Sequence, residues 1–300
     1  MRRIPLYVFG GFLGAGKTTL INDILARGRL RAGVLVNDFG AINIDASLIA
    51  GARGRVTRLA NGCVCCSLGD DLAQALGEVV EAGEDLDAIV IEASGVGDPW
   101  RIAEIAYLDR ALTLGAVFCV ADATAIAAQM RDARIGDIVG AQIAGADIVL
   151  LTKCDLVDAA ARAAARASIA QQRADARIVE IENGAAPFEL MDVAHEDRPR
   201  APDATRHETR FTRFSYLRAG AFDRARLGAA LAGAPPALLR LKGFCALQGE
   251  PPALLQMVGA RWSLTPAPTA TPAAGVRLAG VLAGPLQETA TLERRLDAAL

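Results

Sequence analysis

At residues 11–18 the chain reads Gly-Phe-Leu-Gly-Ala-Gly-Lys-Thr, and this stretch decides the fold. It follows an apolar run over residues 4–10 and precedes a helical pattern that starts at Thr18 and ends near residue 26. Glycines at these spacings let the backbone curl around a phosphate, so that N–H groups and a helix N-terminus face its oxygens. In such a loop the lysine bridges the β- and γ-phosphates and the threonine hydroxyl binds Mg²⁺. We therefore predict a nucleotide site made by Gly11, Gly14, Ala15, Gly16, Lys17, Thr18 and Thr19.

Further apolar runs alternate with helical patterns along the rest of the first two hundred residues. Continuous apolar strands separated by helices are typical of a parallel sheet covered on both faces. The sequence thus predicts an α/β fold with a doubly wound, mostly parallel sheet. The expected strands cover residues 32–36, 88–91, 114–120, 147–151 and 177–181, and the expected helices 70–82, 99–107, 123–131, 135–145 and 158–172.

A change of composition divides the chain. Residues 195–203 are polar and contain prolines, which is typical of a linker. Beyond them we expect a small α+β domain, with strands near 209–217 and 276–281 and helices at 223–231 and from about 287. The predicted organisation is a nucleotide-binding domain over 1–194, a linker over 195–208 and a C-terminal domain over 209–300.

Bulk properties exclude several classes of protein. Apolar residues make up 52% of the 300, which excludes general disorder, and the net charge of −2 shows no electrostatic footprint for nucleic acid or an anionic membrane. No apolar run approaches the ~18 residues that span a bilayer, and the first residues lead into a strand rather than a signal peptide. We expect a soluble, cytoplasmic protein without nucleic-acid or membrane partners.

A second nucleotide motif is Thr152-Lys153-Cys154-Asp155, which follows an apolar strand. The Asp155 carboxylate can accept hydrogen bonds from guanine N1–H and the 2-amino group, which adenine lacks, and Lys153 can pack beside the base. Sites that hydrogen-bond a substrate group reject analogues without it by ~10⁴-fold or more. The motif therefore predicts GTP, although an aspartate that caps an ordinary turn remains an alternative.

Acidic residues follow two of the strands. Glu92 ends the strand at 88–91 and can hold a Mg²⁺-bound or attacking water, while Gly95 can bring a backbone N–H toward the γ-phosphate. Asp38 and Asp45 are candidates for a segment that senses the γ-phosphate. We take Lys17, Glu92 and Asp38 as the candidate catalytic residues; the alternative for Glu92 is a cap on the next helix.

Cysteines gather between the two nucleotide motifs, in the run Cys63-Val64-Cys65-Cys66. Cys63, Cys65 and Cys66 can give three thiolates to a tetrahedral ion such as Zn²⁺ and leave one position open. Glu92, Asp38 or a water could fill that position. A redox-sensing cluster and incidental core cysteines are the alternatives. The isolated Cys119, Cys154 and Cys245 are expected to be buried, reduced thiols.

Taken together, these motifs resemble those of a known family. The combination of residues 10–20, Asn61-Gly62-Cys63-Val64-Cys65-Cys66, Glu92-Ala93-Ser94-Gly95 and Thr152-Lys153-Cys154-Asp155 is similar to that of the CobW-type GTPases. These include the zinc-regulated GTPase metalloprotein activators and are related to the nickel-insertion GTPases of hydrogenase and urease. Residues 238–243 and Trp262 resemble the family's small second domain, so the resemblance covers nearly the whole chain.

The resemblance implies GTP hydrolysis with Mg²⁺, binding of Zn²⁺ or Co²⁺ at the three cysteines, and delivery of the metal to a client metalloprotein. Related GTPases suggest a homodimer by analogy. A GTPase regulator with a redox-sensing or purely structural cysteine cluster is the alternative function.

Three departures from the family pattern stand out. Asn37-Asp38-Phe39-Gly40-Ala41 replaces the usual Asn-Glu-Phe-Gly-Glu, so a carboxylate is lost, and Thr152 replaces the usual asparagine of the base motif. Many relatives carry a histidine-rich tract, whereas this chain has only His195 and His207. We expect both histidines to be solvated linker residues and the chain not to store metal.

Overall fold

The computed structural model describes residues 3–27, 30–36, 56–58, 70–81, 86–192, 195, 211–267, 275–283 and 287–300. The chain forms two compact units. Of the described residues, those up to 195 belong to the first unit and those from 211 onward to the second.

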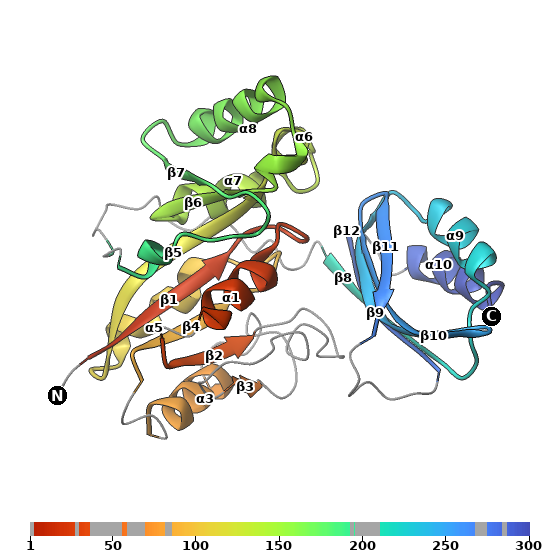
Figure 1. Cartoon of the computed structure of the whole chain (residues 1–300), viewed down its shortest axis with the longest axis horizontal. Helices are drawn as coiled ribbons and strands as arrows, with labels where there is room; N and C mark the ends of the chain where they lie inside the picture. The colour runs from red at the N-terminus through yellow and green to blue at the C-terminus, as the bar shows by residue number, and fades with distance from the viewer. Residues whose placement is uncertain are drawn as a thin grey trace. The chain divides into compact units, whose positions relative to one another are not determined.

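The first unit is built on a parallel sheet of seven strands in the order β3-β2-β4-β1-β5-β6-β7 (Figure 1). Its strands are β1 (Ile4–Gly10), β2 (Ala32–Val36), β3 (Val56–Arg58), β4 (Ala88–Glu92), β5 (Leu112–Asp122), β6 (Ile148–Thr152) and β7 (Arg177–Glu180). The helices are α1 (Lys17–Ala26), α3 (Asp70–Glu81), α4 (Pro99–Ala103), α5 (Ile105–Leu108), α6 (Ile126–Arg131), α7 (Gly136–Gly145) and α8 (Ala159–Gln172), with short 3₁₀ turns at Cys154–Leu156 and Phe188–Asp192. The predicted α/β class with a mostly parallel sheet is confirmed.

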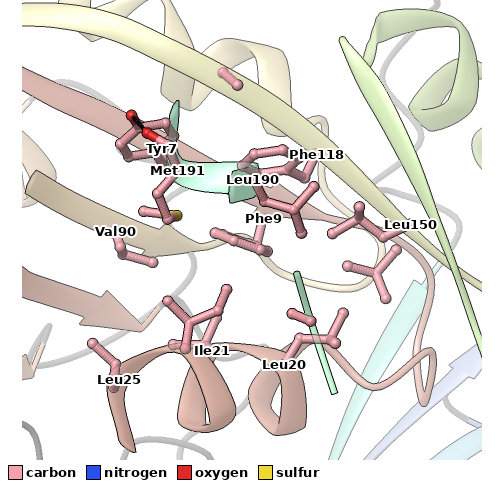
Figure 2. Close-up of a cluster of buried hydrophobic side chains, with 14 of the residues drawn as sticks. Tyr7, Phe9, Leu20, Ile21, Leu25, Val90, Phe118, Leu150, Leu190 and Met191 are labelled. Atoms are coloured by element: carbon pink, nitrogen blue, oxygen red, sulfur yellow. Dashed lines mark hydrogen bonds between the residues drawn. The ribbon is translucent and has the colours of Figure 1, made fainter. Parts of the chain in front are cut away.

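Both faces of this sheet are packed, as the continuous apolar strands require. Successive residues of β1 point to opposite faces: Tyr7 and Phe9 join the cluster that contains α1, while Leu6 and Val8 join the cluster that contains α3 and α4. Figure 2 shows the first cluster, in which Leu20 and Ile21 of α1 lie beneath Phe9. The Tyr7 hydroxyl donates to the carbonyl of Met191, which ties the segment after β7 across the sheet (Figure 2).

Several predicted boundaries differ from those observed. The helix expected over 99–107 is two short helices, α4 and α5; the Asp98 carboxylate caps α4 by accepting from the Trp100 N–H at 2.9 Å. The strand expected over 114–120 runs from Leu112 to Asp122, which places the Asp122 carboxylate at the carboxyl end of this central strand. Strand β3 was not expected, because three residues are too short for a recognisable pattern.

The prediction for His195 was wrong. Its Nδ1 lies 2.9 Å from Asp147 Oδ2, with the two side chains only 7% and 8% exposed, and the Trp100 ring lies 5.5 Å from its ring centroid. A polar neighbourhood in the sequence did not reveal a buried carboxylate partner more than forty residues away. His207 lies outside the described residues.

The second unit is an antiparallel sheet of five strands in the order β11-β10-β9-β12-β8, with α9 and α10 packed together (Figure 1). Its elements are β8 (Phe211–Arg218), α9 (Arg224–Ala232), β9 (Leu238–Leu247), β10 (Glu250–Val258), β11 (Arg261–Pro266), β12 (Val276–Ala283) and α10 (Gln287–Asp297). Leu227 and Leu231 of α9 and Leu292 of α10 pack on the sheet in one apolar cluster. The smaller α+β unit is thus confirmed, although β9, β10 and β11 were not expected. Across the described ranges of both units, no helix is long and apolar enough to cross a membrane.

Candidate nucleotide site

The phosphate loop (residues 11–18) leaves the carboxyl end of β1 and runs into α1, as predicted. Gly11 has φ +123°, and a Cβ placed there would lie 2.1 Å from the carbonyl oxygen of Val120 in β5. Only glycine fits this backbone and this close approach. Gly14 and Gly16 also have positive φ, at 76° and 101°, and Gly16 immediately precedes α1. The loop therefore packs closely against the central strand β5, and the N-terminus of α1 follows directly after it.

Lys17 folds back over this loop. Its ammonium donates to the carbonyl oxygens of Gly11 at 2.7 Å and Phe12 at 3.3 Å, and the residue is 4% exposed. The ammonium is therefore buried inside the loop and satisfied by backbone carbonyls.

Thr18 and Glu92 meet across the loop. The Thr18 hydroxyl lies 2.9 Å from Glu92 Oε1 and 3.0 Å from Oε2, and Glu92 is 4% exposed. The pairing of β4 with β1 sets Glu92 beside Phe9, so its carboxylate reaches the start of α1. The two residues chosen from separate motifs are thus brought together.

The base motif (residues 152–155) leaves β6 next to the phosphate loop. Thr152 Oγ1 donates to the carbonyl of Ala15 at 2.6 Å and lies 3.1 Å from that of Ala121. Lys153 has φ 60°, and its ammonium contacts the Gly14 carbonyl at 2.9 Å. The side chains of Thr152 and Lys153 therefore both join the base motif to the phosphate loop. Thr152 makes its bond although it replaces the asparagine that is usual in the family.

Asp122 is a site residue that sequence reasoning missed. Its Oδ2 lies 2.6 Å from Lys153 Nζ, and its Oδ1 accepts from the Thr124 hydroxyl at 2.6 Å and N–H at 2.8 Å. Burial alone would raise the pKa of this carboxyl, but the hydrogen bonds from Lys153 and Thr124 outweigh burial and hold the pKa below its ordinary value. Asp122 ends a buried strand, as Glu92 does, and this shared position is the sequence signal that could have identified Asp122.

Asp155 is held by a second loop that was not predicted, residues 182–186 after β7. Asp155 Oδ1 accepts from the Asn183 N–H at 2.9 Å, and Asn183 has φ 52°. At the far end of the loop, Asp23 of α1 accepts from the Ala186 N–H at 3.0 Å. A Cβ on Gly184 would lie 3.1 Å from Thr19 Cγ2, so Thr19 faces this loop. The carboxylate chosen as the guanine reader is thus held at one of its two oxygens.

The predicted metal ligands cannot be placed in the same way. Cys63, Cys65 and Cys66, together with Asp38 and Asp45, lie outside the described residues. Within the described ranges no group of three potential ligands comes together. Cys119, Cys154 and Cys245 are buried free thiols, as expected, and burial raises the pKa of Cys119 to about 12 and that of Cys245 to about 11.

Two family models match the chain along most of its length. The model described as "CobW/HypB/UreG, nucleotide-binding domain" matches residues 5–180, and "Cobalamin synthesis protein cobW C-terminal domain" matches 211–300. The chain belongs to the CobW/HypB/UreG family. Lys17, Glu92 and the base motif all fall inside the first of these matches, so the geometry described above is that of the family's nucleotide-binding domain.

Similar proteins include named zinc chaperones. Zinc chaperone CobW of Pseudomonas aeruginosa is 35% identical over 225 residues, which are 64% of this chain and 60% of the relative. Zinc-regulated GTPase metalloprotein activator 1 of Schizosaccharomyces pombe is 33% identical, covering 60% and 46%, and zinc chaperone YjiA of Escherichia coli is 33% identical, covering 52% and 51%. The matches thus span about half to six tenths of these relatives. Among solved structures, Zn(II)-bound YjiA GTPase from E. coli covers 100% of both chains at a TM-score of 0.48 and 20% identity.

Proposed function

We propose that this protein is a GTP-hydrolysing metallochaperone. In this account it binds zinc, or cobalt, through Cys63, Cys65 and Cys66 and releases the metal to a client metalloprotein under the control of the bound nucleotide. The names of the curated relatives support the zinc-related part of the proposal. The chemistry of three adjacent thiolates supports it independently, because thiolates are the ligands that zinc prefers among side chains.

The observation that carries the nucleotide part is the direct bonding between the base motif and the phosphate loop. Lys153 bonds to Gly14 and Thr152 bonds to Ala15, so the group that would read the base and the loop that would bind the phosphates form one rigid frame. Such a frame fixes the distance between the base and phosphate ends of its ligand. Positioning of this kind accounts for most of the catalysis of phosphoryl transfer, together with electrostatic stabilisation.

The oxygen atoms of Thr18 and Glu92 fit Mg²⁺, which takes hard oxygen ligands and retains several waters. Thr18 would bind the ion directly and Glu92 would hold one of its waters. Bound there, Mg²⁺ would neutralise charge on the β- and γ-phosphates. Lys17 would move its ammonium from the Gly11 and Phe12 carbonyls to the phosphate oxygens, and Gly95 would donate a backbone hydrogen bond.

Nucleotide control of the metal follows from the order of the motifs. In the sequence, the segment with Asp38 and the cysteine run both lie between β2 and β4, whose carboxyl ends lie at the same end of the parallel sheet as that of β1, where the phosphate loop begins. GTP would order both, and hydrolysis would remove the γ-phosphate contacts and loosen the metal. Reversal of a loading equilibrium from 1:99 to 99:1 requires about 5.5 kcal/mol of differential binding. The contacts of the γ-phosphate and its Mg²⁺ would supply that energy, and the second unit would recognise the client.

Guanine specificity can be tested at Asp155. In Asp155→Asn an amide donor replaces one carboxylate oxygen, so GTP should bind at least about tenfold more weakly. Xanthosine triphosphate carries a carbonyl in place of the 2-amino group and should bind the variant better than the parent. Equal affinity for GTP and ATP in the parent protein would refute the assignment of Asp155.

The alternative function is a GTPase regulator whose cysteines sense oxidants or hold a fixed structural zinc. Peroxide that changes GTPase activity in metal-free buffer would favour redox sensing. A chelator that unfolds the protein would favour structural zinc. The proposed chaperone loses zinc to the chelator, keeps its fold by circular dichroism, and releases zinc at a rate that depends on the nucleotide.

A further inference from the structure

Helix α7 presents an unusual residue to the interior. The buried side chains of this helix include the apolar Ile138, Val139 and Ile143. The polar side chain of Gln142 is buried beside them, with only 2% of the residue exposed. A buried amide is costly unless its hydrogen bonds are satisfied. Among the described residues the Nε2 group of Gln142 has partners and its Oε1 has none.

The partner is the loop of residues 93–97, which follows Glu92 and which we call the γ loop. Gln142 Nε2 donates to the carbonyl of Gly97 at 2.9 Å and reaches that of Gly95 at 3.4 Å. One amide group thus bonds two carbonyls of a loop that lies more than forty residues earlier in the chain.

The γ loop is held at both ends as well. The Ala93 N–H donates to the Phe9 carbonyl at 2.9 Å, and the Gly97 N–H closes a turn onto the Ser94 carbonyl at 3.2 Å. Between these points, Gln142 is the only hydrogen-bond donor to the Gly95 carbonyl among the described residues.

The γ loop also lies against the phosphate loop. A Cβ on Gly95 would be 2.4 Å from Leu13 Cδ2 and 3.0 Å from the Leu13 backbone nitrogen. Gly95 therefore lies against Leu13 of the phosphate loop and accepts a hydrogen bond from Gln142 of α7. The Gly95 carbonyl and the Val96 N–H belong to one planar trans peptide group, so a bond from Gln142 to this carbonyl sets the plane of that group and directs the Val96 N–H away from Gln142.

We propose that Gln142 is a positioning residue that aims the γ loop at the γ-phosphate. This inference rests on the proposed GTPase function and adds a residue to it. Gln142 does not touch the nucleotide; it acts through Gly95 and Gly97. Its loss should weaken the binding of GTP, which has a γ-phosphate, and leave the binding of GDP unchanged, because the phosphate loop and base motif hold the rest of the ligand.

The decisive variant is Gln142→Leu, which has a similar volume but no hydrogen-bond donor. We expect GDP affinity within about threefold of the parent, affinity for a non-hydrolysable GTP analogue about tenfold lower, and single-turnover hydrolysis slowed by about tenfold or more. Ile143→Ala, on the same buried face, is the matched control: it should lower stability in urea without changing the ratio of GTP-analogue to GDP affinity.

Gln142→Glu gives an independent readout, the pH dependence of the ratio of GTP-analogue to GDP affinity. A residue that served packing alone would not change this pH dependence. The introduced carboxyl can donate one hydrogen bond when protonated and none when ionised. The affinity ratio of this variant should therefore approach that of the parent near about pH 5.5 and fall near about pH 8.5, relative to the parent at each pH. This variant also serves if Gln142→Leu does not fold.

An unchanged ratio in Gln142→Leu, or equal losses for GDP and the GTP analogue, would overturn the inference, as would a pH-independent ratio in Gln142→Glu. Failure of the proposed function would look different. In that case the parent protein itself would neither bind the GTP analogue nor hydrolyse GTP.

Discussion

The two units of this chain bury different kinds of residue. In the first, buried polar groups gather at the ends of the parallel strands and on α7: Lys17, Glu92, Ser94, Asp122, Gln142, Asp147 and Thr152. In the second, Lys242 is the buried polar residue among those described, and the core is otherwise aliphatic and aromatic. Because buried polar groups oppose folding unless they are paired, their concentration marks where a fold serves chemistry as well as stability. Substitutions of the buried polar residues at the nucleotide site of the first unit should therefore change nucleotide handling, whereas substitutions of buried apolar residues in the second should change stability alone.

The largest effect is expected for Lys17→Ala, which removes the ammonium from the phosphate loop. Affinity for both GTP and GDP should fall about 1,000-fold, equivalent to about 4 kcal/mol, because a charge-assisted contact to the phosphates is lost. Titration with a fluorescent guanine nucleotide measures this directly. Nucleotide affinity that stays within a few fold of the parent would show that this loop does not bind phosphate.

Leu255→Ala tests the other half of the comparison. Leu255 is fully buried in β10, and its truncation should lower the free energy of unfolding by about 3 kcal/mol through lost burial and a residual cavity. Urea denaturation measures the loss, and nucleotide titration of the folded variant should give parental affinities. If nucleotide affinity fell in step with stability, the division between the units would not hold.

Asp122→Asn should have a smaller effect that depends on pH. The native pKa of Asp122 lies below the ordinary value of 3.8, so its ion pair with Lys153 stabilises the fold above that pH, and this stabilisation is lost as the pH falls through the native pKa. We expect the variant to be about 1.5 kcal/mol less stable near neutral pH, with a difference that shrinks in acid.

Urea denaturation of parent and Asp122→Asn at pH values of about 7, 5 and 3 checks this sign. A difference in stability that grows toward low pH would contradict the assigned ion pair.

The smallest effect is expected for Arg224→Ala, which breaks a surface pair in the second unit. Arg224 contacts both oxygens of Glu250 at 2.8 Å and 2.5 Å, but both side chains are exposed, so solvent screens the pair. Neither the urea midpoint nor the nucleotide affinity should change measurably. A clear loss of nucleotide affinity would place part of the nucleotide chemistry in the second unit.

The sequence predicted best where a motif had both a local pattern and a chemical reason. Glycine spacing and an acid at a strand end singled out Lys17, Thr18 and Glu92 as candidates, and the structure brings Thr18 and Glu92 within hydrogen-bond distance. The parallel sheet followed from continuous apolar runs, which periodicity detects without knowledge of contacts.

Residues whose roles depend on distant partners were missed. Asp122 matters because Lys153 reaches it, Asn183 because Asp155 accepts from its N–H, and Gln142 because its amide meets the γ loop. No local pattern encodes these pairings. His195 was misjudged for the same reason, since its neighbours in sequence are polar while its partner, Asp147, is buried.

The central claim is that the phosphate site and the three cysteines form one switch. Zinc affinity, measured by competition with a chromophoric chelator in the presence of a GTP analogue and then of GDP, tests it most directly, with Cys65→Ser as the control. The account predicts a shift between the two nucleotide states of at least about tenfold that disappears in Cys65→Ser. Equal zinc affinity in both states would contradict metal delivery and leave a GTPase with a structural or redox cysteine cluster.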